Sequence, residues 1–264
     1  MKEQIKHSHL FRNLHVKGDP LILFNIWDVA SAKSVADAGA KVIATSSWSV
    51  AAAHGYVDGE NLPLELAIAN IKRIVDAVEV PVSIDFEGGY ANSLPELEKN
   101  ISLLIDTGIV GINFEDQILG KNSLYSIEEQ CARIAAIRKA ATEKSMPLFI
   151  NARTDIFLKA DPSNHTKIHL KEALARTRAY ANAGADGFFV PGLSNIDYIA
   201  KLCALAPIPI NILMNSEDLS IKRLKEAGVA RISYGESPFV QVMKTLKENT
   251  FSALQKDLFY RTAH

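Results

Sequence analysis

The sequence has few cysteines, no excess of either charge and no long hydrophobic run. Cys131 and Cys203 are far apart and lack CxxC spacing, which argues against a disulfide scaffold or a structural zinc site and favours a reducing environment. The 29 basic and 30 acidic residues give no electrostatic reason to expect binding to nucleic acid or to an anionic membrane. The N-terminal segment MKEQIKHSHLFRNLHVKGD lacks the apolar run of a signal peptide, and no segment has the roughly 18 apolar residues of a membrane span. We therefore expect a cytoplasmic protein without nucleic-acid or membrane partners.

Eight short apolar runs, rich in β-branched and aromatic residues, recur along the chain. Each is too short for a buried helix and too continuously apolar for a strand with one exposed face. Such runs are typical of the strands of a parallel sheet, which are buried on both faces. The runs cover residues 21–27, 41–48, 81–87, 111–116, 147–153, 187–192, 209–213 and 231–235.

Segments with helical spacing separate these runs. The clearest cover residues 64–77, 93–108, 126–144 and 170–185, with Ser93 and Ser126 as predicted N-caps. No G-x-G-x-x-G follows the first run, so a dinucleotide-binding doubly wound sheet loses its main support. We predict one (β/α)₈ (TIM) barrel domain over residues 1–264, because about 250 residues are typical of this fold.

The segment after the eighth run, residues 237–262, predicts two helical stretches where one would complete the barrel. Its apolar positions Phe251, Leu254, Leu258 and Phe259 exceed what a single barrel needs to bury. We therefore expect an extra C-terminal helix that packs on a neighbouring subunit of a homo-oligomer.

Acidic residues follow two neighbouring runs. Asp85 and Glu87 end the third run and Glu115 ends the fourth, at the edge where active sites of such barrels are built. Carboxylates that converge there repel one another unless a cation joins them, and oxygen ligands without His or Cys favour Mg²⁺ or Mn²⁺. The alternative is a structural network in which these acids pair with Arg153 and nearby lysines.

Three further strand-end residues could bind an anion. Arg153 is the only cation at a strand end and would suit a substrate carboxylate or phosphoryl group, although it could instead pair with Glu115 or Asp155. Ser46 and Ser47 offer hydroxyl and backbone N–H donors for a carboxylate.

Together these motifs resemble the isocitrate lyase/phosphoenolpyruvate mutase superfamily over about residues 21–235. The segment Asp85-Phe86-Glu87-Gly88-Gly89-Tyr90 is similar to the family's D-x-D/E-x-G-Y motif. Further matches are Glu115-Asp116, Asn151-Ala152-Arg153-Thr154-Asp155, Ser46-Ser47-Trp48 and Asp58 in Gly55-Tyr56-Val57-Asp58.

The resemblance implies an enzyme that makes or breaks a C–C or P–C bond next to a pyruvyl unit, through an enolate stabilised by Mg²⁺. Its substrate would be a small α-oxo acid or phosphonate. By this likeness Asp85 holds the metal, with Glu87, Glu115 and Asp58 assisting through water. The segment Ser46-Ser47-Trp48 binds the substrate carboxylate, and Arg153 neutralises developing charge. The resemblance also implies a dimer or tetramer, commonly a tetramer with swapped last helices.

Departures from the family pattern narrow the subgroup. Isocitrate-cleaving members carry K-K-C-G-H after the fourth strand, whereas residues 117–124 here contain no cysteine. The segment Lys121-Asn122-Ser123 instead resembles the K-x-N-S loop of the phosphonomutases, whose asparagine contacts the transferring phosphoryl group. Gln117 replaces a basic residue common in that loop, and Glu87 replaces an aspartate.

Two alternatives stay open at this point. One is a decarboxylase or hydrolase of an oxaloacetate-like acid, which needs the metal and enolate site but no catalytic cysteine. The other is a barrel that binds an oxo acid without turning it over, because a shared fold does not by itself establish a shared activity.

Overall fold

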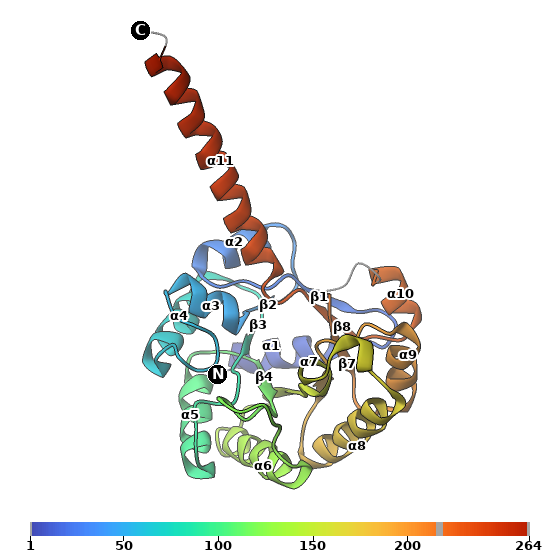
Figure 1. Ribbon diagram of the computed structural model, residues 1–264. Coiled ribbons are helices and arrows are strands. Elements are labelled where there is room, and N and C mark those ends of the chain that lie inside the picture. Colours follow the sequence, from blue (N-terminus) through green and yellow to red (C-terminus); the bar gives the residue numbers. More distant parts are fainter. Residues whose placement is uncertain (1, 215–218, 263–264) are drawn as a thin grey trace.

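Eight parallel strands form a barrel surrounded by helices (Figure 1), as the sequence predicts. The computed structural model describes residues 2–214 and 219–262. The strands are β1 (Leu21–Leu23), β2 (Ile43–Ala44), β3 (Val82–Asp85), β4 (Gly111–Glu115), β5 (Phe149–Arg153), β6 (Gly187–Phe189), β7 (Ile210–Leu213) and β8 (Arg231–Ser233). Their order in the sheet is β1-β8-β7-β6-β5-β4-β3-β2, with every pairing parallel.

The ring between β1 and β2 is closed by residues just beyond the strands. Ile26 and Thr45 form an isolated parallel bridge, and the Ile26 amide donates to the Ala44 carbonyl at 2.9 Å. The Asn25 side chain adds a hydrogen bond to the Thr45 carbonyl at 2.8 Å. The sheet is thus a nearly closed barrel.

Helices cover the outside of this barrel. They are α1 (Lys2–Asn13), α2 (Val29–Asp37), α3 (Ser47–Ala53), α4 (Leu64–Ala77), α5 (Leu94–Asp106), α6 (Ile127–Glu143), α7 (Ile156–Lys159), α8 (Lys167–Ala183), α9 (Ile196–Leu205), α10 (Ile221–Glu226) and α11 (Ser237–Thr262), with a short 3₁₀ turn at Pro162–Asn164. The predicted caps are confirmed, because Ser93 accepts from the Glu96 amide and Ser126 forms a capping box with Glu129. None of the helices in the described ranges is long and apolar enough to cross a membrane.

The structure corrects two details of the sequence prediction. Ser47 and Trp48 do not end a strand but begin α3, because the Ser46 side chain caps that helix by accepting from the Ser49 amide at 3.3 Å. Residues 237–262 form one continuous helix, α11, instead of two stretches. After Pro238 the segment contains neither glycine nor proline, so no residue in it interrupts helical hydrogen bonding.

The N-terminal end of the barrel is closed by α1. Phe11, which is fully buried, reaches in against β4 and β5, and its ring centroid lies 5.1 Å from that of Phe149. A Cβ atom on Gly111 would come within 2.5 Å of the Phe11 ring, so only glycine fits there. The opposite, C-terminal end of the strands is the open face in Figure 1, and α11 projects away from the barrel beside it.

Hydrogen bonds across the barrel show which side chains point inward. Arg231 on β8 donates to the Asn113 side chain on β4 at 3.0 Å, and Asn151 on β5 donates to the same oxygen at 2.8 Å. Because β8 and β4 are not neighbours, these side chains must lie inside the barrel. Alternation along the strands then places Asp85, Glu115 and Arg153 on the inner face as well. The strand-end acids therefore share the barrel mouth.

Candidate active site at the barrel mouth

Asp85 lies at the centre of the acidic residues in the mouth. Its Oδ2 atom accepts a hydrogen bond from the Ser47 hydroxyl at 3.0 Å, with the Ser47 amide at 3.5 Å. Its Oδ1 atom is buried and has no hydrogen-bond partner among the described residues. A buried carboxylate oxygen without a partner is costly unless a cation or water meets it.

Asp58 approaches Asp85 from the loop between α3 and α4. Partial burial raises the pKa of Asp58, and the nearby Asp85 carboxylate raises it further, while Ser47 and Arg153 lower it. The residue is exposed at the rim of the mouth. The structure therefore brings together Asp58, Asp85 and Ser47 from three separate segments of the chain.

Glu87 also lies at the mouth, but its carboxylate connects two loops. It accepts a hydrogen bond from the Glu60 amide at 2.7 Å and one from the Tyr90 hydroxyl at 3.4 Å. The Glu60 carboxylate in turn accepts from the Tyr90 amide at 2.7 Å. We call Glu60, Glu87 and Tyr90 the loop clasp, because they fasten the loop that carries Asp58 to the loop after β3.

The backbone of the loop clasp is strained. All three members have positive φ angles, 57° for Glu60, 49° for Glu87 and 53° for Tyr90, a region that residues other than glycine seldom adopt. Burial raises the pKa of Glu87 to about 8, with Asp58 and Asp85 adding to the effect. Such strain and such a pKa gather at functional sites more often than elsewhere.

Arg153 is held by two acids in this structure. Its Nη1 atom lies 3.0 Å from Glu115 Oε2, and its Nε and Nη2 atoms donate to Asp155 at 2.6 and 3.0 Å. Burial alone would lower the pKa of Arg153, but Glu115, Asp155 and Asp85 together raise it well above its ordinary value. Burial has the opposite effect on Glu115: it raises the pKa of that carboxyl group, while the positive charge of Arg153 lowers it. Arg153 thus pairs with both Glu115 and Asp155, the alternative to substrate binding that the sequence left open.

Asp116, the neighbour of Glu115, belongs to a separate network outside the mouth. It is fully buried and accepts from the Tyr180 hydroxyl at 2.8 Å and from Arg176 at 3.1 Å. It also accepts from the Asp155 amide at 3.1 Å, which fixes the residue that holds Arg153. This residue therefore supports the site without facing it.

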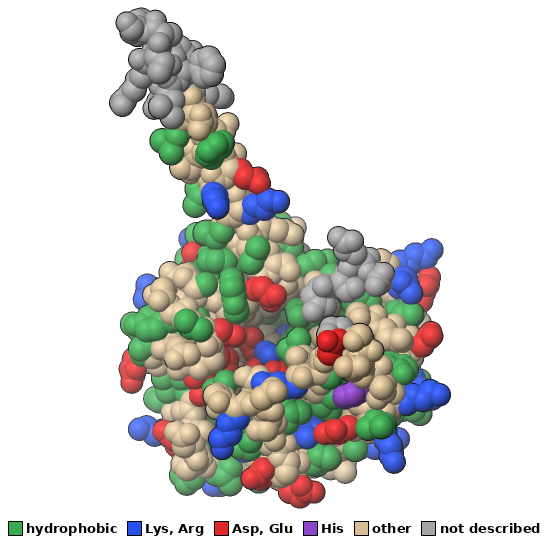
Figure 2. All heavy atoms as spheres, viewed as in Figure 1, with side chains coloured by type: hydrophobic (Ala, Val, Ile, Leu, Met, Phe, Trp, Pro, Cys, Tyr) green, Lys and Arg blue, Asp and Glu red, His purple; other side chains and the backbone are tan. Residues whose placement is uncertain are grey.

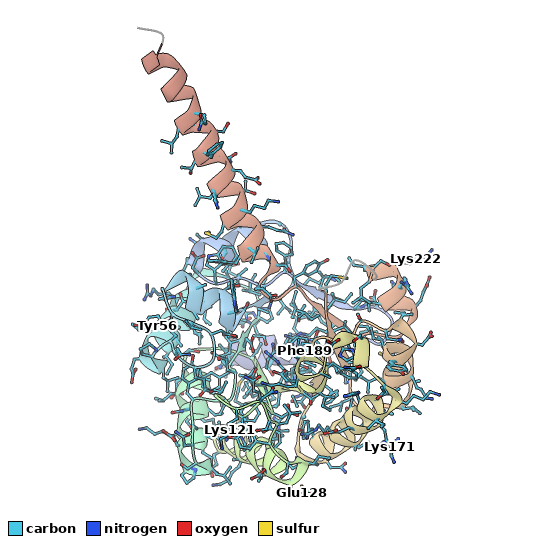
Figure 3. All side chains as sticks on the ribbon, viewed as in Figure 1. Tyr56, Lys121, Glu128, Lys171, Phe189 and Lys222 are labelled. Carbon is cyan, nitrogen blue, oxygen red and sulfur yellow. The ribbon has the colours of Figure 1, made fainter. Side chains whose placement is uncertain are left out.

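The remaining predicted residues lie around the rim. Ser46 is buried as the cap of α3, and Trp48 is 41% exposed with its ring centroid 5.9 Å from that of Phe239 on α11. Asn122 is exposed in the loop after β4 and forms no side-chain hydrogen bond within the described ranges. In Figure 3 the neighbouring Lys121 lies toward the rim and Phe189, from the end of β6, toward the middle of the barrel face.

Within residues 2–214 and 219–262, no three His, Cys, Asp or Glu side chains are close enough to ligate one ion together. The donor set nevertheless fits a hard cation held by one direct carboxylate, because Asp85 Oδ1 is buried without a partner among the described residues and further acids lie near enough to affect one another's pKa. Figure 2 shows acidic and basic side chains gathered in a hollow at the centre of this face.

Sequence reasoning missed two residues that the structure assigns to this region. Glu60 lies in a loop without a recognisable pattern, so nothing in the sequence pointed to the loop clasp. Arg231 begins the eighth apolar run and is 1% exposed. Its position was the available signal, because a charged residue at the start of a run buried on both faces costs stability and so points to a function.

Comparison with known proteins shows which family and solved structures this chain resembles. The family model described as phosphoenolpyruvate phosphomutase matches residues 11–254. A putative phosphonomutase from Burkholderia cenocepacia is 45% identical, with a TM-score of 0.93, covering 95% of this chain and 99% of that one. An uncharacterized protein of Mycobacterium tuberculosis is 33% identical over 229 residues, 87% of this chain and 83% of its own. A phosphonopyruvate hydrolase in complex with oxalate and Mg²⁺ shares the fold, with a TM-score of 0.82 at 20% identity over 95% of this chain and 88% of that one.

Proposed function

The chain belongs to the phosphoenolpyruvate phosphomutase family, within the isocitrate lyase/phosphoenolpyruvate mutase superfamily, and we propose that it acts on a small α-oxo acid or phosphonate with Mg²⁺ or Mn²⁺ as cofactor. Members of this superfamily are lyases and mutases that make or break a C–C or P–C bond. The observation that carries the proposal is the buried, unpartnered Oδ1 atom of Asp85 at the centre of the acidic mouth.

The proposed site assigns one task to each residue. Asp85 would hold the cation directly, and Asp58, Glu87 and Glu115 would assist through water. When bound, the metal would act as a Lewis acid on the oxygen of a pyruvate enolate.

Substrate contacts would come from two sides of the mouth. The segment Ser46-Ser47-Trp48 would bind the substrate carboxylate, chiefly through the backbone N–H groups of Ser47 and Trp48. The Ser47 amide lies 3.5 Å from Asp85 Oδ2, whereas the Ser46 amide already donates to the Ile26 carbonyl at 3.1 Å. Arg153 would neutralise charge that develops in the transition state. The ion pair with Asp155 holds the guanidinium in a fixed orientation, so the side chain would need to move less when the transition state forms.

The bond that is cleaved depends on the loop after β4. We favour P–C chemistry, in which Asn122 contacts the phosphoryl group, because this exposed side chain is free of hydrogen bonds within the described part of the chain. The second candidate is decarboxylation or hydrolysis of an oxaloacetate-like acid. It is supported by the absence of a cysteine from residues 117–124, since such a reaction needs no thiol acid.

Turnover assays with Mg²⁺ on phosphonopyruvate, oxaloacetate and alkylated malates would test this proposal. Asp85→Ala should abolish Mg²⁺ and oxalate binding measured by calorimetry, whereas Asn122→Ala should abolish P–C cleavage and largely spare decarboxylation. Cleavage of none of these acids by a protein that still binds oxalate would overturn the lyase or mutase assignment. Full P–C activity in Asn122→Ala would overturn the role of the loop.

We further propose a cytoplasmic homo-oligomer, a dimer or tetramer assembled through α11. This helix leaves the barrel (Figure 1) and exposes Val240, Val242, Met243, Leu246, Phe251 and Leu254. A helix with so many exposed apolar side chains favours burial against another subunit. Leu246→Glu should reduce the mass measured by light scattering, and an unchanged mass would argue against this interface.

A further inference from the structure

Arg231 is a buried cation without an acidic partner among the described residues. Its side chain is 1% exposed inside the barrel, and Nη2 donates to the Asn113 side chain at 3.0 Å. Its Nε and Nη1 atoms are buried without a hydrogen-bond partner in the ranges that the structure describes. The same ranges contain no ion pair of Arg231 with a carboxylate within 4.0 Å.

Such a placement works against stability. Arginine keeps its charge inside proteins, and an apolar residue of similar volume often replaces a buried charge at no cost. The carbon of the guanidinium lies 5.9 Å from the centroid of the buried Phe11 ring. Burial lowers the pKa of Arg231 to about 9, with Asp85 opposing that change, so the group stays protonated at neutral pH.

The guanidinium lies on the inner side of the metal site. Asn113, which accepts its hydrogen bond, is the register partner of Asp85 between β3 and β4, and the Phe86 amide donates to the Asn113 carbonyl at 3.1 Å. Paired strands lie about 4.8 Å apart, so the charge of Arg231 stands close beneath the Asp85 carboxylate. The Asp85 oxygen without a partner and the free nitrogens of Arg231 are both buried in this interior.

The mouth carries more acid than base. Asp58, Asp85, Glu87 and Glu115 face one strand-end cation, Arg153, which is already paired with Glu115 and Asp155. In their ionised forms these acids attract a divalent ion, but they repel the anionic oxo acid or phosphonate of the proposed function. A positive charge fixed beneath the mouth would offset part of this excess of negative charge. Because it does not lie at the surface of the mouth, it would not occupy the site itself.

We propose that Arg231 is a specificity-determining residue whose buried charge weakens the binding of the divalent cation and strengthens the binding of the anionic substrate. This inference rests on the proposed function, because it assumes a cation at Asp85. Arg231 touches neither ligand and acts through its field and through Asn113. Its loss should therefore move cation and anion affinity in opposite directions, which a general loosening of the barrel would not do.

The test compares Arg231→Met and Arg231→Gln, which remove the charge, with Arg231→Lys, which keeps a titratable cation at this position. Calorimetry would measure the Kd of Mn²⁺ for the full-length protein, and then the Kd of oxalate at saturating Mn²⁺. We expect the two neutral variants to bind Mn²⁺ at least about tenfold more tightly and oxalate at least about tenfold more weakly. At an effective dielectric of about 20, a unit charge changes the binding of a doubly charged ligand by more than about tenfold at any separation below about 20 Å. Arg231→Lys should lie between wild type and the neutral variants in both, because burial brings the pKa of a lysine closer to neutral than that of an arginine.

Arg138→Met serves as the matched control. Arg138 on α6 is less buried than Arg231 and lies outside the barrel interior, where it pairs with Asp186 and donates to the Gly184 and Leu148 carbonyls. Its loss therefore removes a positive charge and its hydrogen bonds without removing a charge beneath Asp85. Neutral Arg231 variants that weaken both ligands, or leave both unchanged, would overturn the inference while the proposed function stands. An equal response in Arg138→Met would also overturn it. A wild-type protein that binds neither Mn²⁺ nor oxalate would overturn the proposed function, and the inference with it.

Discussion

The carboxyl group of Glu87 makes the stability of the metal-free protein depend on pH. Glu87 is 5% exposed, and burial, Asp58 and Asp85 raise its pKa from 4.5 to about 8 in the folded state. Because the folded state binds the proton more tightly than the unfolded state, the stabilisation is complete below about pH 4.5. It is lost as the pH rises toward 8.

Replacing Glu87 with glutamine should remove this dependence. Glutamine has no proton to lose, and its amide oxygen can still accept from the Glu60 amide. The gap between 4.5 and about 8 corresponds to about 5 kcal/mol at ~1.36 kcal/mol per pH unit. About 3.5 kcal/mol of that change falls between pH 5 and pH 8.

Urea denaturation followed by circular dichroism, with a chelator present, would measure this difference at pH 5, 6, 7 and 8. The free energy of unfolding of Glu87→Gln should rise relative to wild type across that range. Glu65→Gln, a change at an exposed glutamate in the first turn of α4, should follow the wild type at every pH. Parallel curves for wild type and Glu87→Gln would refute the reasoning, because the Glu87 carboxyl would then titrate alike in both states.

Two further substitutions test the framework around the site. Asp116→Ala should lower the free energy of unfolding by about 3 to 5 kcal/mol, because it leaves the buried Tyr180 hydroxyl and Asp155 amide without this acceptor and Arg176 with Glu172 as its remaining carboxylate. Urea denaturation would measure the loss, and a change below about 1 kcal/mol would contradict it. Gly89→Ala should cost about 1 to 3 kcal/mol, since Gly89 has a φ of 93° and a Cβ atom there would lie 2.5 Å from Leu97 Cδ1. A thermal midpoint equal to that of wild type would contradict this, since it would show that Leu97 on α5 can move aside at no cost.

The order of elements was predictable because it depends on local patterns. Runs of residues buried on both faces, helical spacing and capping residues such as Ser126 are properties of short segments. The rule that polar strand ends meet at one edge of the barrel then sufficed to bring Asp85, Glu115 and Arg153 together. The predicted strands were too long, because the apolar runs continue past the last hydrogen bond between strands. The second run ends at Ser46, where α3 begins.

The sequence by itself determined the barrel, the family and the set of acids at the mouth, because each follows from periodicity or from residues that are close together in the chain. Only the tertiary structure decided the partners of those acids. Glu87 joins Glu60 from a loop 27 residues away, and Arg231 reaches Asn113 across the barrel from 118 residues away. Contacts of this kind depend on how segments pack in three dimensions, and no local pattern in the chain specifies them.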